Sequence, residues 1–340
     1  MSHEIMELDR PMFASVPAWH GLGTVIPDAF ELTPSTRDDL LSLSGLKWRA
    51  LESEVLTASG QARAPDGTLI SFSSQAPNHK AIIRSDTHDV LGVVGSGYTV
   101  IQNSGLANFL TELAASPSVK IETAGSIQNG RRVWMAARTP GFTINGNDPV
   151  QPYLMVTNRH DGRGPFIAKL TSIRPVCWNT LTAALGQKTP EFRIRHTSNA
   201  ASQAADAAQV LGLALQATAT LQEQATFLSS QTIGSADLSR FFLQVFETLH
   251  GPVNPNPTTP TEERRLRSSV KTVAAMHETF DHERSLLGAT ANRWLAFNAA
   301  SKHVQSNRLR EDPDTNFESL LFGTRDTSTS TLLDLALTTA

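Results

Sequence analysis

The chain has 340 residues, of which 40% are hydrophobic and 18% charged, with 29 Lys and Arg against 32 Asp and Glu. This composition is that of a globular protein and excludes a fully disordered or fibrous chain. The single cysteine, Cys177, excludes an internal disulfide and favours a reducing compartment, and no run approaches the roughly 18 apolar residues of a membrane span. The first ten residues carry three acids and no apolar core, so we expect no secretory signal, a cytoplasmic location and no membrane partner.

The first hundred residues alternate apolar and polar positions between turn signals, a pattern that is typical of β-hairpins. Turn signals here are Pro, Asp and Gly, which favour the φ angles that tight turns require. We predict, in order, a short helix over 38–46, a hairpin from Val55 to Phe72 around Pro65-Asp66-Gly67, strands at 80–85 and 90–101, and a helix over 102–116 that Asn103 or Ser104 can cap.

Residues 119–138 carry the clearest local signal. Asn129-Gly130 lies between two β-type runs, and a type I′ turn requires positive φ at both central residues, which Asn and Gly adopt at low cost. We therefore predict a hairpin. Strict alternation after the turn places Arg132, Trp134 and Ala136 on one face and Arg131, Val133 and Met135 on the other.

The remaining chain changes from strands to helices. We predict strands at 153–158 and 166–176, a helix over 177–186, a strand at 191–197, helices over 198–230 and 236–250, two further helices, and a short apolar helix ending the segment 323–340. The fold class is α+β: a mostly antiparallel sheet with helices packed on it, then a helical C-terminal region. The predicted domains are an α+β core (1–200), a helical extension (201–251), a Pro-rich linker (252–263) and a helical C-terminal region (264–340).

The near-neutral total charge conceals an uneven distribution. Residues 119–199 hold 11 Lys and Arg against 4 Asp and Glu, a net charge of +7, between flanks of −6 and −4. Such asymmetry indicates an anionic partner. The alternative is that these bases pair with the acidic flanks.

Three groups of residues resemble catalytic or metal sites, and each has a simpler structural interpretation. His20 lies in PAWHGLGT, but no G-x-G-x-x-G fingerprint follows, and a glycine turn is favoured. Cys177 lies near His160, Asp161 and Asn179 but also beside Trp178, where a buried thiol is expected. The helix containing His277, Asp281, His282 and Glu283 lacks H-E-x-x-H spacing, which favours a solvated helix end. We predict no catalytic residue, metal or cofactor.

The basic segment interleaves cations with aromatic residues, a mixture suited to single-stranded nucleic acid, because Lys and Arg neutralise phosphates while aromatic rings stack on bases. The alternative places the tryptophans in the core. Phe166 is a further stacking candidate. The predicted nucleic-acid-binding residues are Arg131, Arg132, Trp134, Arg159, Arg163, Lys169, Arg174, Arg193 and Arg195.

Several segments together resemble the phage/plasmid-like family that is known as domain of unknown function 932. These segments are PAWHGLGT (17–24), YTVIQN (98–103), TAGSIQNGRRVW (123–134), TNRHDGRGP (157–165), RPVCWNTL (174–181) and RHT (195–197), with weaker matches in WLAFNAA (294–300) and LFG (321–323). The resemblance implies a phage, prophage or plasmid origin in a bacterial host and no established activity. The order of predicted elements also resembles the core of RecT/Redβ single-strand annealing proteins, as a fold analogy.

We therefore expect a non-enzymatic protein that binds or anneals single-stranded DNA in mobile-element DNA metabolism, acting as a homo-oligomer. One alternative is a phage factor that binds a host or phage protein without nucleic acid. A second is a hydrolase or nuclease using His20, His160, Asp161 or His196, although four acids in 119–199 are few for metal-assisted cleavage.

Overall fold

The computed structural model describes residues 24–27, 29–113, 119–174, 179–182, 191–197, 207–306 and 312–339. Antiparallel strands occupy the first part of this range, and helices occupy the last. The predicted α+β class is confirmed. Within the described residues, no helix combines the length and the apolar character that crossing a membrane requires.

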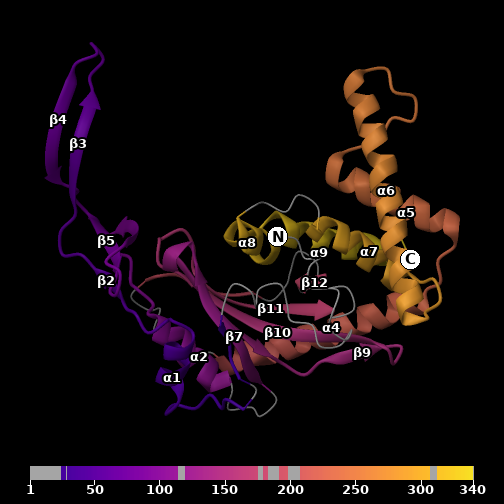
Figure 1. Cartoon of the computed structure of the whole chain (residues 1–340), viewed down its shortest axis with the longest axis horizontal. Helices are drawn as coiled ribbons and strands as arrows, with labels where there is room; N and C mark the ends of the chain where they lie inside the picture. The colour runs from indigo at the N-terminus through magenta and orange to yellow at the C-terminus, as the bar shows by residue number, and fades with distance from the viewer. Residues whose placement is uncertain are drawn as a thin grey trace.

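An eight-stranded sheet forms the centre of the molecule (Figure 1). Its strands follow the order β1-β7-β8-β10-β11-β12, with β9 paired to β10 and β13 paired to β11, all antiparallel. The hairpin predicted over 119–138 and the strands predicted at 153–158 and 166–176 form the middle of this sheet. The strands are β1 (Thr24–Val25), β7 (Lys120–Ile127), β8 (Arg132–Arg138), β9 (Phe142–Ile144), β10 (Asp148–Arg159), β11 (Phe166–Arg174), β12 (Asn179–Thr182) and β13 (Glu191–Ile194).

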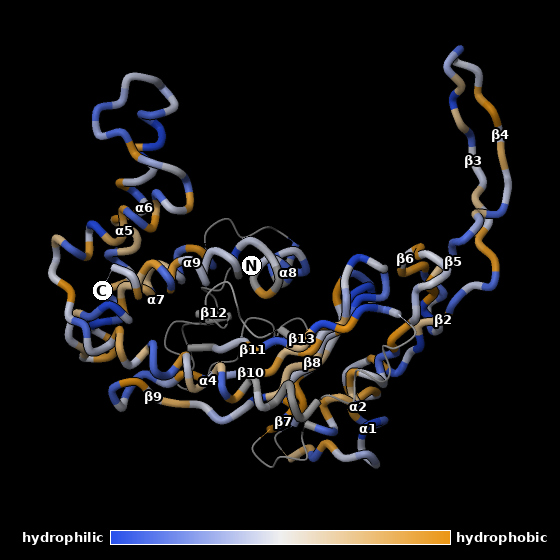
Figure 2. Tube along the Cα trace, turned by 180° about the vertical axis from the view of Figure 1, so that it is seen from behind, coloured by the Kyte–Doolittle hydropathy of each residue, from blue (hydrophilic) through white to orange (hydrophobic). Residues whose placement is uncertain are grey.

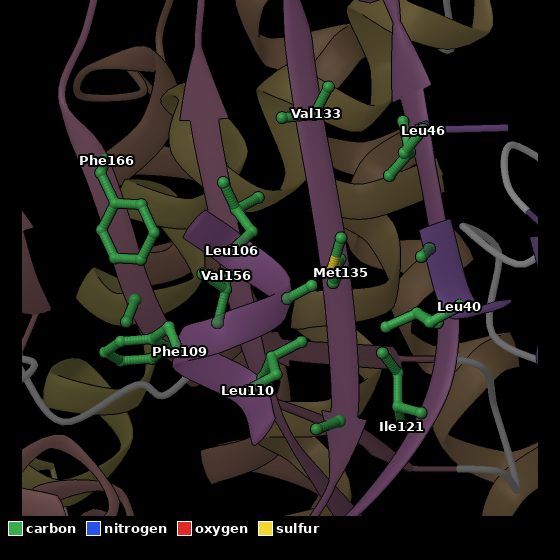
Figure 3. Close-up of a cluster of buried hydrophobic side chains, with 14 of the residues drawn as sticks. Leu40, Leu46, Leu106, Phe109, Leu110, Ile121, Val133, Met135, Val156 and Phe166 are labelled. Atoms are coloured by element: carbon green, nitrogen blue, oxygen red, sulfur yellow. The ribbon is translucent and has the colours of Figure 1, made fainter. Parts of the chain in front are cut away.

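One face of the sheet packs on helices α2 (Asn103–Leu113) and α4 (Ala207–Ser230), and α1 (Arg37–Leu43) packs on α2. Val133 and Met135 of β8 lie in the same buried cluster as Leu106 and Phe109 of α2 (Figure 3). Their burial confirms the predicted alternation along β8. A fully buried side chain of this size contributes about 1.5–3 kcal/mol, so this face anchors the fold.

Helix α8 (Pro313–Phe322) covers part of the opposite face of the sheet. Trp134 and Ala136, the partners predicted on that face of β8, are buried there with Tyr153 and Met155 of β10, and Leu321 of α8 completes the cluster. The sequence did not predict α8. Because α8 covers the face that carries Arg132 and Trp134, the solvent exposure of these side chains depends on this helix.

The C-terminal helices build a second core beside the sheet. This core joins α4 with α5 (Ser235–His250), α6 (Pro260–Leu287), α7 (Arg293–Ser306) and α9 (Thr324–Thr338). Ile144 of β9 and Val150 of β10 belong to the same cluster, so the sheet and the helices share buried surface. Trp294 of α7 also donates a hydrogen bond to the Asp148 carboxylate of β10 at 2.8 Å.

The Pro-rich segment joins α5 to α6, and the two helices pack against each other. Helix α6 begins with a capping box, in which Thr259 accepts a hydrogen bond from the Glu262 amide and the Glu262 carboxylate accepts one from the Thr259 amide. Hydrogen bonds from Thr258 and Asn254 to this carboxylate lower the pKa of Glu262 to about 2. The last residues of the predicted linker, 260–263, are therefore helical, and the domain boundaries stay a prediction.

A β-hairpin arm, formed by β3 (Thr57–Arg63) and β4 (Leu69–Gln75), extends away from the rest of the molecule (Figures 1 and 2). Every residue of both strands is exposed. A small three-stranded sheet of β2 (Ala50–Glu52), β5 (His79–Arg84) and β6 (Val90–Gly95) carries the arm at its base. The predicted hairpin and the strands at 80–85 and 90–95 are thereby confirmed, whereas residues 96–101, predicted to continue the second strand, form a turn and a loop.

Two other predicted elements differ from the structure. Residues 179–182, predicted as part of a helix, form strand β12, because they pair with the end of β11 and complete the sheet edge; the other residues of that predicted helix lie outside the described range. The Asn129-Gly130 turn is a loop of residues 128–131 with positive φ at Gln128, Asn129 and Gly130, not a two-residue type I′ turn. The hairpin itself is confirmed.

Asn103 has a role other than the predicted cap. Its side-chain amide donates to the carbonyls of Leu46 and Trp48, at 3.0 and 3.1 Å, and its oxygen faces His160 Nε2 at 2.9 Å. The residue thus ties the start of α2 to the segment before β2 and to the end of β10.

Candidate nucleic-acid interface

Four of the predicted phosphate-binding residues gather at one end of the central sheet. Arg131 lies in the loop between β7 and β8, Arg163 in the loop between β10 and β11, and Arg193 and Arg195 at the end of β13. Strand pairing brings these segments to the same end, because Arg132 lies opposite both Ile127 and Arg159, and Ile194 lies opposite Phe166. All four arginines are exposed. We call Arg131, Arg163, Arg193 and Arg195 the arginine rim.

The position of Arg131 is set by the small sheet at the base of the arm. Arg84 of β5 stacks over the Trp48 ring at 4.7 Å and donates a hydrogen bond to the Asn129 carbonyl at 3.3 Å. Gly130, with φ +93°, lies so close to Trp48 that a Cβ atom would be 2.9 Å from its ring. Trp48 and Arg84 therefore hold the loop in place. The Arg131 side chain itself forms no ion pair with any residue in the described part of the chain.

The loop that carries Arg163 is organised by Asp161. One carboxylate oxygen of Asp161 accepts hydrogen bonds from the Arg163 amide at 3.0 Å and from Arg159 Nε at 2.9 Å. Strand β6 approaches from the other side, where a Cβ atom on Gly92 would be 2.6 Å from Asp161 Cα. Burial opposes the Asp161 charge, but the hydrogen bonds from Arg159 and Arg163 outweigh it and lower the pKa of Asp161.

A pocket of about 320 Å³ opens between β6 and the two loops. It combines two exposed guanidinium groups with the apolar side chains of Val90 and Val93, each 52% exposed. Such a pocket offers cationic contacts for phosphate beside an apolar surface for a base or sugar. Its lining residues are Val90, Leu91, Gly92, Val93, Arg131, Asp161 and Arg163.

Four other predicted residues are buried in this structure. Arg132, Arg159 and Lys169 are 6%, 8% and 6% exposed, and Trp134 is fully covered. The physical reason is α8, whose Leu321 packs against Trp134 and whose backbone carbonyl at Leu321 accepts from Lys169 Nζ at 3.0 Å. Phe166, the second stacking candidate, is also buried, in the core on the other face.

The two buried arginines share one carboxylate. Glu318 Oε1 of α8 lies 2.7 Å from Arg159 and 3.0 Å from Arg132, and Arg159 also forms a two-pronged pair with Asp161. Burial and the neighbouring charge of Arg159 lower the pKa of Arg132 to about 10. Hydrogen bonds to Asp161 raise the pKa of Arg159 against the effect of burial. Arg132 and Arg159 therefore pair with acids, which is the alternative interpretation of the basic segment given above.

Arg174 is the one predicted site residue far from both groups. It ends β11, whereas Arg163 precedes the first residue of that strand. Nine residues of strand span about 30 Å, so Arg174 lies at the opposite end of the sheet from the arginine rim.

The described histidines that a hydrolase would use are buried and engaged. His160 is fully covered and its Nε2 faces the Asn103 oxygen, while burial and the nearby His196 lower the pKa of His160 to about 3. His196 stacks on Tyr98, and its Nδ1 lies 3.0 Å from the Thr99 carbonyl. Burial also lowers the pKa of His196, and both rings are part of the packing. His20 and Cys177, and the candidate stacking residue Trp178, lie outside the described residues.

The helical acid and histidine group also proves structural. His277 Nε2 contacts the Ser239 hydroxyl of α5 at 2.9 Å, and Asp281 pairs with Arg284. Glu283, predicted at a solvated helix end, is instead 1% exposed, because this side of α6 faces the second core. The described residues contain no group of three or more His, Cys, Asp or Glu that could hold a metal ion.

Sequence reasoning missed the acids that matter most at this site. Asp314 and Glu318 lie about 150 or more residues beyond the strands they contact, at Gln128, Arg132 and Arg159. Asp312 followed by Pro313 at a helix start was an available signal for α8, since Asp caps and Pro favours the first turn. No local pattern, however, indicates which sheet face this helix covers.

The chain is similar to a known protein family. A family model described as a domain of unknown function (DUF932) matches residues 90–333, which include the central sheet from β7 onward, the arginine rim and α8 but not the β3–β4 arm. No curated protein and no solved structure matches the chain. All the resembling segments except 17–24 fall within the matched range, and this range extends through the C-terminal helices as well. Because the model covers more than half of its length, the chain belongs to the DUF932 family.

Proposed function

We propose that this protein binds single-stranded nucleic acid, DNA in the first instance, through the arginine rim. The observation that carries the proposal is the gathering of four exposed arginines, from three separate segments, at one end of one sheet. Guanidinium groups neutralise phosphates and also stack on bases, so a row of them suits a flexible strand without sequence preference.

The surroundings of the rim support this assignment. Val90 and Val93 supply an apolar wall beside Arg131 and Arg163. Asp161, the one carboxylate lining that pocket, already accepts three hydrogen bonds from Arg159 and Arg163, so it is directed into the protein. The net field at the pocket therefore remains favourable to a phosphate.

A double charge reversal tests the proposal. We expect R131E/R163E to lose most binding of a fluorescently labelled oligothymidylate, measured by anisotropy between 50 and 300 mM KCl. With roughly −0.7 per phosphate for a single strand, the four rim contacts contribute about −2.8 to the log–log salt slope, and the variant loses about half of this contribution. A matched control is R240E/R267E, which changes the net charge equally on exposed residues of α5 and α6. Equal losses in both variants, or binding indifferent to salt, would refute the assignment.

The finer proposal is a strand-annealing role in mobile-element DNA metabolism, with the protein acting as a homo-oligomer. Annealing of two complementary labelled strands, followed by energy transfer, measures the activity directly. Light scattering during size-exclusion chromatography measures the assembly. An oligomer that binds strands without accelerating their pairing would limit the function to binding.

The β3–β4 arm favours protein binding as a second candidate function. Ala58, Ala62, Ile70 and Phe72 share one face of the hairpin, and Ile70 and Phe72 are 53% and 42% exposed. An isolated two-stranded hairpin is marginal in water, so a partner that covers this face would stabilise it. Loss of a partner from nuclease-treated host lysate on removal of the arm, with oligonucleotide binding intact, would support this function.

A further inference from the structure

Two arginines face each other across neighbouring strands beneath α8. Arg132 of β8 lies directly opposite Arg159 of β10 in the register of the sheet. Like charges at such positions destabilise a sheet, and both side chains are buried. The pair therefore requires an anion close to both guanidinium groups.

Helix α8 supplies that anion from the chain itself. A single oxygen of Glu318 contacts both arginines, at 2.7 and 3.0 Å, while Lys169, on the same face of the sheet, donates to the carbonyl of Leu321. Asp314, one turn earlier, accepts from the backbone amide of Gln128 at 2.6 Å, in the loop that carries Arg131. Acidic and carbonyl oxygens of α8 thus occupy positions that phosphate oxygens of a nucleic acid would take.

Among the described residues, α8 meets the sheet and its loops through polar contacts of Asp314, Glu318 and the Leu321 carbonyl, and through the apolar side chain of Leu321. Of the α8 side chains that the structure describes, Leu321 alone is buried. Helix α9, by contrast, buries Leu332, Leu333 and Ala336 in the second core, and Gly323 separates the two helices. Ion pairs can be exchanged for equivalent ion pairs with another anion, whereas an apolar contact cannot. Helix α8 is therefore the part of this layer that an anion can replace while α9 stays in place.

We propose that Arg132, Arg159 and Lys169 form a second phosphate site, which Glu318 of α8 occupies in the free protein and which the backbone of a bound strand takes over by displacing α8. This inference rests on the proposed binding at the arginine rim, because the rim lies at the end of the same strands. It also explains why cations that the sequence marks as phosphate ligands are covered here. Because Glu318 occupies the site in the free protein, a higher concentration of nucleic acid is needed for binding. Strands that are long enough to extend beyond the rim are therefore favoured.

Neutralising the internal acid tests the proposal. We expect Glu318→Gln to bind labelled oligothymidylate more tightly than the wild type, because the strand no longer competes with an internal carboxylate for Arg132 and Arg159. The matched control is Asp237→Asn, which removes one negative charge from an exposed acid of α5 that pairs with Arg240. Circular dichroism establishes that both variants are folded. Identical binding by the two variants would overturn the inference.

If Glu318→Gln fails to fold, a reversible disulfide that holds α8 on the sheet provides a second test. The backbone amide of Gln128 donates to the Asp314 carboxylate at 2.6 Å, so these two positions are adjacent, and Q128C/D314C in a Cys177→Ser background is designed to tether α8 by a disulfide. We expect the oxidised form to bind with the shallow slope of the rim alone and the reduced form to bind more steeply. Equal slopes would overturn displacement of α8 while leaving the rim intact. Absence of binding by the wild type and by both forms of the variant would refute the rim, on which the inference rests, and this outcome differs from the failure of displacement alone.

Discussion

Replacing Asp161 with asparagine measures what the ion pair between Arg159 and Asp161, next to the arginine rim, contributes to stability. The chain offers a matched comparison, because Arg84 and Asp86 form the same two-pronged pair, with distances of 2.7 and 3.0 Å against 2.9 and 2.6 Å for Arg159 and Asp161. The two pairs differ in burial: the side chain of Asp161 is 5% exposed and that of Asp86 is 47% exposed.

This difference in burial sets the expected magnitudes. Removing one partner of a buried pair costs about 3–5 kcal/mol, because the remaining charge is left uncompensated. Glu318 still neutralises Arg159, so we expect about 3 kcal/mol for Asp161→Asn, near the lower limit. An exposed pair contributes at most about 1 kcal/mol, and we expect Asp86→Asn to fall below that value.

Urea unfolding of both variants at neutral and acidic pH provides the assay. The pKa of Asp161 is lowered in the folded protein, so its contribution is complete above the unfolded value of about 3.9 and is lost as the pH falls through the lower folded pKa. The difference between the wild type and Asp161→Asn should therefore shrink below about pH 4. Equal destabilisation by the two substitutions at pH 7, or a difference that is independent of pH, would refute the reasoning.

Two further predictions concern backbone geometry and the arm. Gly130→Ala should destabilise the protein by more than about 1 kcal/mol in urea unfolding, because it adds a clash with Trp48 to the strain of positive φ; Gly67→Ala, at φ +88° with open space, supplies the strain alone as a control. Deleting residues 57–75 should leave the melting temperature of the remaining chain unchanged within about 2 °C, since every residue of both strands is exposed. A large drop on calorimetry would show that the arm supports the body.

Much of the fold could be predicted from local patterns. The 119–138 hairpin follows from β-type runs around Asn129-Gly130, and the alternation along β8 correctly separates Val133 and Met135 from Trp134 and Ala136. The failure at 179–182 has a clear cause: pairing with β11 decides the conformation of this short segment, and no local periodicity reports that pairing.

The candidate site divides in a similar way. The sequence identified the basic segment, and the exposed rim residues Arg131 and Arg163 belong to it. It could not separate them from Arg132 and Arg159, one and four residues away, because exposure depends on α8 rather than on the strands. A count of charges in residues 119–199 includes Arg132 and Arg159 but not Glu318, the acid that pairs with them in the folded protein.

The sequence by itself determined the α+β class, the family and the excess of positive charge between residues 119 and 199, because these follow from composition, alternation and local motifs. Tertiary structure decided where that charge lies and which part of it is exposed. Antiparallel pairing brings four arginines to one end of the sheet, and packing of α8 buries two others against Glu318. Contacts between residues more than 150 positions apart depend on the whole fold, since they form only where the helical layer meets the sheet.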